Sequence, residues 1–283
     1  MIIDFHTHTF PDKVAAAAIP MMEQEIAGNN DYESPMKAKL SGTAAQLEQS
    51  GKVHGIDLSV VLPVATSPKQ SESINLFAAR ANEQTRQTGL MSFGAIHPDN
   101  ENYREILRGL KSRGIKGIKL HPDYQKVMFD DPRYLRIMDF AAELDMIIVT
   151  HAGVDIGKPH VVHCTPDMVC RVDEVLQYPK LVLAHMGGWR MWDEVEEKIV
   201  GRRLYLDTAV CFEPTVHHME KEQFLRFINK HGADKILFGT DSPWSDQGAG
   251  IKKIKSMELP ENQERAILGG NAKALLSIKT GDK

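Results

Sequence analysis

The sequence predicts an α/β fold, a single (β/α)8 (TIM) barrel domain over residues 1–283 with long loops after strands 1 and 5. Barrels of this kind run to about 250 residues, so the length suits one. Short apolar runs rich in Ile and Val recur along the chain, and a stretch of helical character follows each of them. No G-x-G-x-x-G motif follows the first run, which argues against an open, doubly wound dinucleotide-binding sheet.

The expected strands end in polar, Gly or Pro residues. Most are too short for helices, and their continuous apolar character indicates parallel strands that are buried on both faces. They span residues 2–6, 56–64, 90–98, 115–122, 146–153, 181–188, 203–209 and 235–243.

Helices are expected between these strands, and several of them end at Gly, as helices often do. Their ranges are 43–55, 72–89, 102–114, 132–145, 166–179, 192–199, 222–232 and 262–279. The two long insertions, residues 10–42 and 152–165, follow the first and fifth strands. Loops on that side of a barrel form the substrate site.

Composition narrows the classes of partner and compartment. A formal charge of −4 argues against nucleic acid or an anionic membrane, so a small-molecule substrate is expected. The three cysteines have no zinc-knuckle spacing and suggest a reducing compartment. No signal-peptide pattern opens the sequence, and no apolar run approaches the roughly 20 residues of a membrane span. The cytoplasm is therefore the expected location.

Histidine and aspartate stand at the carboxyl ends of several expected strands. His6 and His8 end the first strand, His151 the fifth, His185 the sixth and Asp241 the eighth. In a parallel barrel these ends meet at one mouth, where the active sites of such enzymes lie. Imidazole with carboxylate is the usual ligand set of a catalytic divalent metal. The pattern indicates a metal centre for which zinc is the default ion, and manganese would also fit.

Four more residues near strand ends leave alternatives open. Because side chains alternate along a strand, Asp4 is expected on the face of His6, where it would support a ligand or bond a backbone group. Lys119 and His121 share a face at the end of the fourth strand, and His97 ends the third. A single histidine in such a place is more often structural or hydrogen-bonded than a ligand.

The order of the motifs resembles a known superfamily. IIDFHTH (2–8), THAG (150–153), LAHMGG (183–188) and FGTDSPW (238–244) follow one another as in the amidohydrolase superfamily. The closest likeness is to its amidohydrolase-related (family 2) branch, which includes aminocarboxymuconate-semialdehyde decarboxylase, resorcylate decarboxylases and lactone hydrolases. The resemblance covers nearly the whole chain and extends to LGGNAKALL (268–276).

This resemblance implies roles for the residues at the barrel mouth. His6, His8 and His151 would ligate one divalent metal, with Asp241 as the fourth protein ligand. His185 would act as the general acid and base, and Asp241 could share that work.

Lys119 bears on the number of metals. Some members of the superfamily hold two metals bridged by a carboxylated lysine on the fourth strand, and Lys119 lies near that place. A lysine there could equally bind a substrate carboxylate, or be buried with its ammonium paired. The branch resembled is mononuclear, so one metal is expected. His121 stays a candidate for contact with a substrate or a second metal.

Aromatic and basic residues near the mouth suggest a planar, anionic substrate. Arg190 stands between Trp189 and Trp192 after the sixth strand, Trp244 follows the eighth, and His163 lies in the loop after the fifth. A ring and a guanidinium suit a carboxylate through stacking and paired hydrogen bonds. The alternative is that the tryptophans pack between helices and Arg190 pairs at the surface.

The expected function is a metal-dependent hydrolase that acts on a small, carboxylated or cyclic substrate through a metal-activated water. A metal-dependent non-oxidative decarboxylase, a carboxy-lyase for a carboxylated aromatic or enoic acid, would use the same residues and is the alternative. A hydratase is a third variant. A barrel that binds metal without catalysis fits less well because His185 is intact. Relatives commonly pair, so a homodimer is compatible with the sequence.

Overall fold

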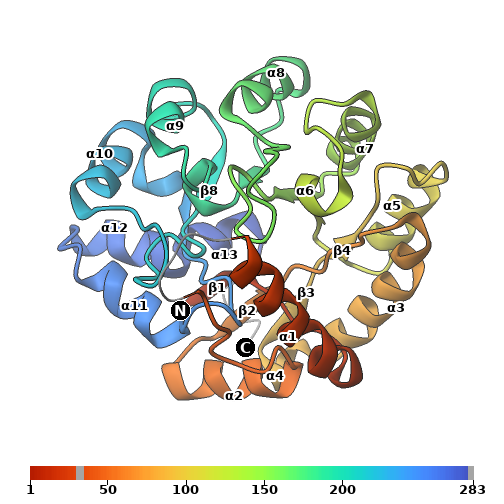
Figure 1. The fold of residues 1–283 in the computed structure, drawn as a ribbon, viewed down its shortest axis with the longest axis horizontal. Helices are drawn as coiled ribbons and strands as arrows, with labels where there is room; N and C mark the ends of the chain where they lie inside the picture. Colours follow the sequence, from red (N-terminus) through yellow and green to blue (C-terminus); the bar gives the residue numbers. More distant parts are fainter. Residues whose placement is uncertain (30–34, 280–283) are drawn as a thin grey trace.

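Residues 1–29 and 35–279 are described by a computed structural model, in which they form the α/β TIM barrel that the sequence predicts (Figure 1). Each predicted strand is present, and the third is divided at Phe93 into β3 and β4. The strands are β1 Ile3–Thr7, β2 Leu58–Val61, β3 Leu90–Ser92, β4 Gly94–Ala95, β5 Gly117–Leu120, β6 Ile147–Thr150, β7 Leu181–Leu183, β8 Tyr205–Asp207 and β9 Ile236–Leu237.

Strand pairing is parallel and follows the order of the chain. The pairs run β1-β2-β3 in one sheet and β4 to β9 in the other. The first strand is also bonded to the last: Phe5 N–H donates to Phe238 O at 2.7 Å, and Asp241 N–H donates to His6 O at 2.8 Å. This pairing sets the end of β1 beside the segment that follows β9. Residues 6–8 and residue 241, far apart in sequence, are thereby neighbours.

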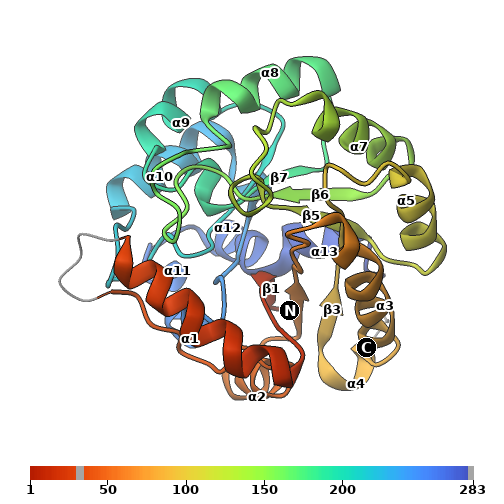
Figure 2. The same cartoon turned by 45° about the vertical axis from the view of Figure 1, so that its right-hand side comes forward.

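Helices surround the strands in both views (Figures 1 and 2). Over residues 1–29 and 35–279, none of them is long and apolar enough to cross a membrane. The helices are α1 Asp12–Gly28, α2 Ala44–His54, α3 Ser71–Asn82, α4 Thr85–Thr88, α5 Tyr103–Ser112, α6 Pro122–Gln125, α7 Pro132–Glu143, α8 Pro166–Leu176, α9 Trp192–Lys198, α10 Lys221–His231, α11 Gln247–Lys255, α12 Glu261–Arg265 and α13 Asn271–Leu275.

Helices α1, α6 and α11 lie where the sequence analysis placed none. Helix α1 occupies much of the insertion expected at 10–42, of which residues 30–34 lie outside the described residues. Helix α1 contains a run of four alanines, and alanine has the highest helix propensity of all residue types. Pro20 interrupts the helical sequence pattern. Asn29, after α1, donates from Nδ2 to Gly157 O at 2.8 Å. The two insertions that follow β1 and β6 therefore contact each other.

The predicted helix 262–279 is divided and has a different place in the fold. It consists of α12, the π-helical turn η4 (Ala266–Gly270) and α13, while α11 is the first helix after β9. Ala272 and Leu275 of α13 belong to the same apolar cluster as Ile3 and Phe5 of β1. A Cβ on Gly269 would lie 2.5 Å from Met1 O, so only glycine allows the chain this close to the first strand. The end of the chain thus packs directly on the strands.

Strand β1 contains a bulge that overturns one expectation. Asp4 pairs with Ser59 and Thr7 pairs with Val61, so three steps along β1 match two along β2. An extra residue in one strand changes which face the next side chains occupy. Asp4 consequently bonds Gln247 of α11 (Nε2 to Oδ2, 2.8 Å), on the outer side of the strand. The prediction that it shares the inner face of His6 was wrong.

Candidate metal centre

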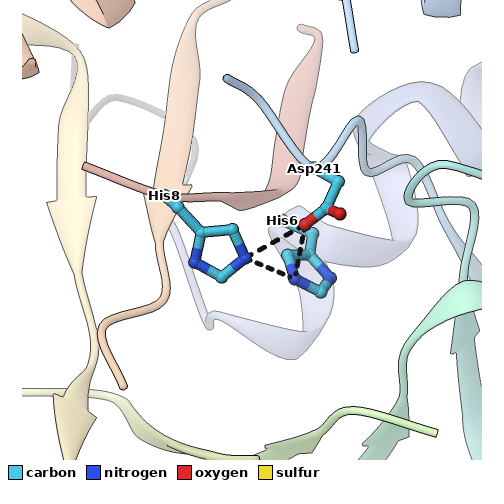
Figure 3. Close-up of side chains that lie close together, drawn as sticks. All are labelled: His6, His8 and Asp241. Atoms are coloured by element: carbon cyan, nitrogen blue, oxygen red, sulfur yellow. Dashed lines mark hydrogen bonds and ion pairs between the residues drawn. The ribbon is translucent and has the colours of Figure 1, made fainter. Parts of the chain in front are cut away.

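Three of the predicted ligands, His6, His8 and Asp241, converge at the end of β1 (Figure 3). Asp241 Oδ1 lies 3.0 Å from His8 Nε2 and 3.4 Å from His6 Nε2. The two Nε2 atoms are 3.2 Å apart. His6 is buried, and His8 and Asp241 are partly exposed, so the group is open on one side. All three come from segments that the pairing of β1 with the last strand holds together.

The remaining nitrogen of each imidazole is bonded to an acceptor. His8 Nδ1 lies 2.8 Å from Leu62 O, and His6 Nδ1 lies 2.8 Å from Asp207 Oδ2. A carbonyl or carboxylate oxygen accepts, so the ring proton of each neutral histidine sits on Nδ1 and leaves Nε2 with a free lone pair. Two nitrogen lone pairs and a carboxylate oxygen then face one another. Three acceptor atoms that face one another can bind a cation, so the residues fit a divalent metal.

Lys119 of β5 lies next to this group. Its Nζ is 3.2 Å from His6 Nε2, and the side chain is almost completely buried. Burial lowers the pKa of Lys119 to about 8, although the carboxylates of Asp207 and Asp241 oppose the shift. Burial and the lysine charge together hold the pKa of His6 well below its ordinary value. The Lys119 ammonium is thus the cation that contacts His6 in this structure.

Asp241 is held in its charged form. Burial works against ionisation, but the close His8, His6 and His185 rings set the pKa of Asp241 below its ordinary value. Its backbone has a φ of 68°, in the left-handed region that few residues other than glycine adopt. Asp241 N–H donates to His6 O, so this strained turn is fixed directly to β1. Strain of this kind is commonly stored at functional sites.

His185, after β7, is positioned by hydrogen bonds to Ala209 and Asp207. Its Nδ1 lies 2.9 Å from Ala209 O, and its N–H donates to Asp207 Oδ1 at 3.0 Å. Its ring centroid is 5.4 Å from that of His6. Burial lowers the pKa of His185, against the pull of Asp241 and Asp207, which favours the neutral ring. With Nδ1 fixed as a donor, Nε2 is the atom that can accept a proton.

His151 does not join the three converging residues. Its Nδ1 is 3.0 Å from His185 Nε2, and its ligating atom groups instead with those of His121 and Asp155. The rings of His121 and His151 are stacked, with centroids 4.4 Å apart and an interplanar angle of 11°. The assignment of His151 to the same metal as His6 and His8 stays a prediction.

The other predicted contacts are spread around the mouth. Trp189 and Trp192 are buried, and their Nε1–H groups donate to the backbone oxygens of His217 and His185. Arg190 is exposed, with its guanidinium 5.6 Å from the Trp189 ring centroid.

Trp244 is buried, and His163 is partly exposed. Trp244 belongs to the main apolar core, and its N–H donates to Asp241 O at 2.9 Å. His163 Nδ1 lies 3.0 Å from Asp123 Oδ1. His97 is buried at the end of β4, where its Nδ1 accepts from Asp99 N–H at 3.1 Å. Packing and local hydrogen bonds account for these contacts.

Sequence reasoning missed three acidic residues of the site: Asp207, Asp123 and Asp155. Asp207 is the last residue of β8. The strand-end criterion that found His6 and Asp241 would have found it as well. Asp123 lies in the four-residue helix α6 and Asp155 in the loop after β6. No periodic pattern marks either of these positions.

Comparison with known proteins agrees with this geometry. The family profile described as amidohydrolase matches residues 3–278. No curated protein sequence gives a significant match. An uncharacterised TIM-barrel protein from Bordetella bronchiseptica aligns over 98% of each chain with 17% identity and a TM-score of 0.71.

Two further solved structures share the fold, and their names give two different reaction types. A probable 2-pyrone-4,6-dicarboxylic acid hydrolase from Acinetobacter baumannii is 15% identical over 98% of this chain and 99% of its own, with a TM-score of 0.64. A dihydroxybenzoic acid decarboxylase from Polaromonas, with bound manganese, is 16% identical over 99% and 98%, with a TM-score of 0.65. The fold and the predicted resemblance are confirmed. Since the profile spans almost the whole chain, this protein is an enzyme that belongs to the amidohydrolase family.

Proposed function

We propose that the protein is a metal-dependent hydrolase whose ion is held by His6, His8 and Asp241. The observation that supports this most is the convergence of three acceptor atoms, with the proton of each imidazole directed away from the others. The donor set of two imidazoles and one carboxylate favours zinc. Manganese is the second candidate, because the Polaromonas decarboxylase binds it.

A bound divalent ion would acidify a water molecule and polarise a substrate oxygen. The residues of the chain supply the proton chemistry around it. The Nδ1–H group of His185 donates to Ala209 O and keeps its proton. Protons are therefore taken up and released at Nε2, the atom that faces His151. Asp241 is ionised at rest, so it can accept a proton transiently while it remains beside the two imidazoles.

The proposed substrate is small and carboxylated or cyclic. The name of the Acinetobacter protein, a probable hydrolase of a pyrone dicarboxylic acid, supports both features. Lys119 can supply a positive charge for a substrate carboxylate, since its Nζ lies at the inner edge of the site. The Polaromonas neighbour supports the alternative, a decarboxylase, in which the same lysine would hold the carboxylate that leaves.

A substrate screen tests the proposal. The purified protein, loaded with zinc or manganese, is incubated with lactones, amides and carboxylated aromatics, and the products are identified by mass spectrometry. A hydrolase gives the ring-opened or cleaved product with one added water. Release of bicarbonate from a carboxylated aromatic would overturn the hydrolase assignment. The matched control is His8→Asn, which removes one imidazole lone pair and should abolish metal-dependent turnover of any substrate found.

A further inference from the structure

The turn that carries His185 has a strained backbone. It follows β7 directly, and the 3-10 turn η2 (His185–Gly187) begins with two consecutive residues other than glycine in the left-handed region. Their φ angles are 58° at His185 and 50° at Met186. L-residues adopt this region at a cost in free energy, so such a turn persists only where the surrounding contacts hold it. The direction of the His185 ring therefore depends on those contacts.

Trp192, the first residue of α9, supplies one of these contacts. Its Nε1–H donates to the backbone oxygen of His185 at 3.0 Å, and the N–H of Gly188 donates to the same oxygen at 3.2 Å. The ring of His185 is held at its other end, where Nδ1–H donates to Ala209 O at 2.9 Å. The backbone and the ring of one residue are thus fixed by two different segments, α9 and the loop after β8.

The indole of Trp192 is itself held in place. Trp192 is only 4% exposed, and the ring of His217 stacks on it with centroids 5.2 Å apart and an interplanar angle of 19°. A buried indole N–H requires an acceptor, and His185 O is the acceptor that it has. Packing and stacking therefore keep the donor of this hydrogen bond in one position, as a group that orients another residue must be.

Trp189, three residues earlier, is equally buried but has different partners. Its Nε1–H donates to His217 O at 2.9 Å, and its backbone N–H donates to Ala152 O at 3.0 Å. A Cβ on Gly153 would lie 2.3 Å from the Trp189 nitrogen, so only glycine allows these two segments to lie this close. The indole N–H of Trp189 thus bonds the loop after β8 rather than His185, which makes Trp189 a matched control for Trp192.

We propose that Trp192 is a positioning residue for His185. Its indole N–H holds the left-handed turn, and the turn keeps the ring of His185 within reach of Ala209 O, with Nε2 directed toward His151. The inference rests on the proposed function only in giving His185 the transfer of protons. Trp192 acts through His185 and does not touch the substrate. Its burial and its hydrogen bond favour this role over the stacking surface for a planar substrate that the sequence suggested.

The tautomer of His185 tests this inference without a substrate. The full chain, with nitrogen-15 in its histidine rings, is measured by NMR as purified, and His185→Gln identifies the His185 signals by their loss. We expect a single tautomer in the native protein, with the proton on Nδ1. Trp192→Phe keeps an aromatic ring but loses the donor, so the turn relaxes and both tautomers should appear. Trp189→Phe loses the indole N–H that bonds His217 O and should keep the single tautomer.

A measurement on the native side chain guards against loss of folding in Trp192→Phe. The chain has three tryptophans, so Trp189→Phe and Trp244→Phe identify the other two indole signals, and the third belongs to Trp192. We expect the indole N–H of Trp192 to exchange with solvent as slowly as the amides of β7, because its hydrogen bond is buried. Fast exchange of this N–H would overturn the inference.

The outcomes separate this inference from the proposed function. On a substrate from the screen, Trp192→Phe should lower kcat by about tenfold or more without changing KM, because proton transfer by a positioned group contributes about 10²–10⁴-fold. The same single tautomer in Trp192→Phe as in the native protein overturns the inference and leaves the proposed function standing. A higher KM with kcat unchanged also overturns it, since Trp192 would then contact the substrate. A mixed tautomer in Trp192→Phe, with no substrate hydrolysed by the native protein, supports the positioning of His185 and refutes the hydrolase.

Discussion

Substitution of Asp207 by asparagine should switch the proton on His6 from one nitrogen to the other. Asp207 Oδ1 accepts from His185 N–H and Ala209 N–H, each at 3.0 Å, and Oδ2 lies 2.8 Å from His6 Nδ1. In Asp207→Asn the amide oxygen would keep the two backbone bonds. The new NH2 group would then face His6 Nδ1, which must accept. The ring proton would move to Nε2, the atom proposed as a ligand.

The expected size of the effect follows from this switch. Loss of a group that orients a ligating histidine typically lowers metal affinity by about 10–100-fold, or about 1.4–2.7 kcal/mol. We expect the upper end, because the proton must leave Nε2 before metal binds. Burial raises the pKa of Asp207, so the neutral amide is easier to bury than the carboxylate. The hydrogen bonds are kept in number, and the unfolding free energy should change by only about 1 kcal/mol.

Competition with a chromophoric chelator measures zinc affinity directly, and urea unfolding of the metal-free protein measures stability. Asp173→Asn is the matched control, since that carboxylate is also buried and bonds Arg202 at 3.0 Å in the helical layer. An affinity of Asp207→Asn within threefold of the native value, with the fold intact, would refute the assignment of the His6 proton to Nδ1.

Three further predictions follow from the same contacts. Chelation of the metal should destabilise the protein, by about 4 kcal/mol if it had been at 1,000 times its Kd, and calorimetry with and without zinc measures this. Lys119→Met should raise zinc affinity, because the ammonium competes for His6 Nε2; a tenfold loss in a binding titration would instead indicate that Lys119 is itself a ligand. His231 accepts from Gly201 N–H and bonds Leu204 O, and burial lowers its pKa. Its contribution to stability is therefore present above about pH 6.5 and lost as the pH falls, so urea unfolding at pH 7 and 5 should show a smaller difference in His231→Gln.

The order of the strands and the grouping of His6, His8 and Asp241 at the end of β1 were predictable from local pattern. Buried parallel strands are apolar throughout, and the residue types that follow them stand out against that background. Asp207 is also a polar residue at the end of an apolar strand, so the same criterion predicts it as a site residue. The helix α1 was hidden by Pro20, which breaks the apparent periodicity without ending the helix.

The face of Asp4 could not be predicted from its own strand. Alternation assigns it to the face of His6, but the bulge depends on how β1 pairs with β2, which is a property of two strands. Because of the bulge, Asp4 contacts the surrounding helices while His6 lies at the barrel mouth. Asp4 accepts from Thr240 Oγ1 at 2.6 Å and thereby fixes the residue before Asp241, while His6 turns toward the mouth.

Residue type alone also leaves open which nitrogen of a histidine is available. The sequence places five imidazoles and carboxylates at one mouth, yet their chemistry depends on the acceptors behind them. A ring N–H of each histidine donates a hydrogen bond: His8 to Leu62 O, His6 to Asp207 and His185 to Ala209 O. These acceptors come from the ends of two other strands, β2 and β8. In this structure the ligating atoms of His6, His8 and Asp241 form one group, and that of His151 lies with those of His121 and Asp155.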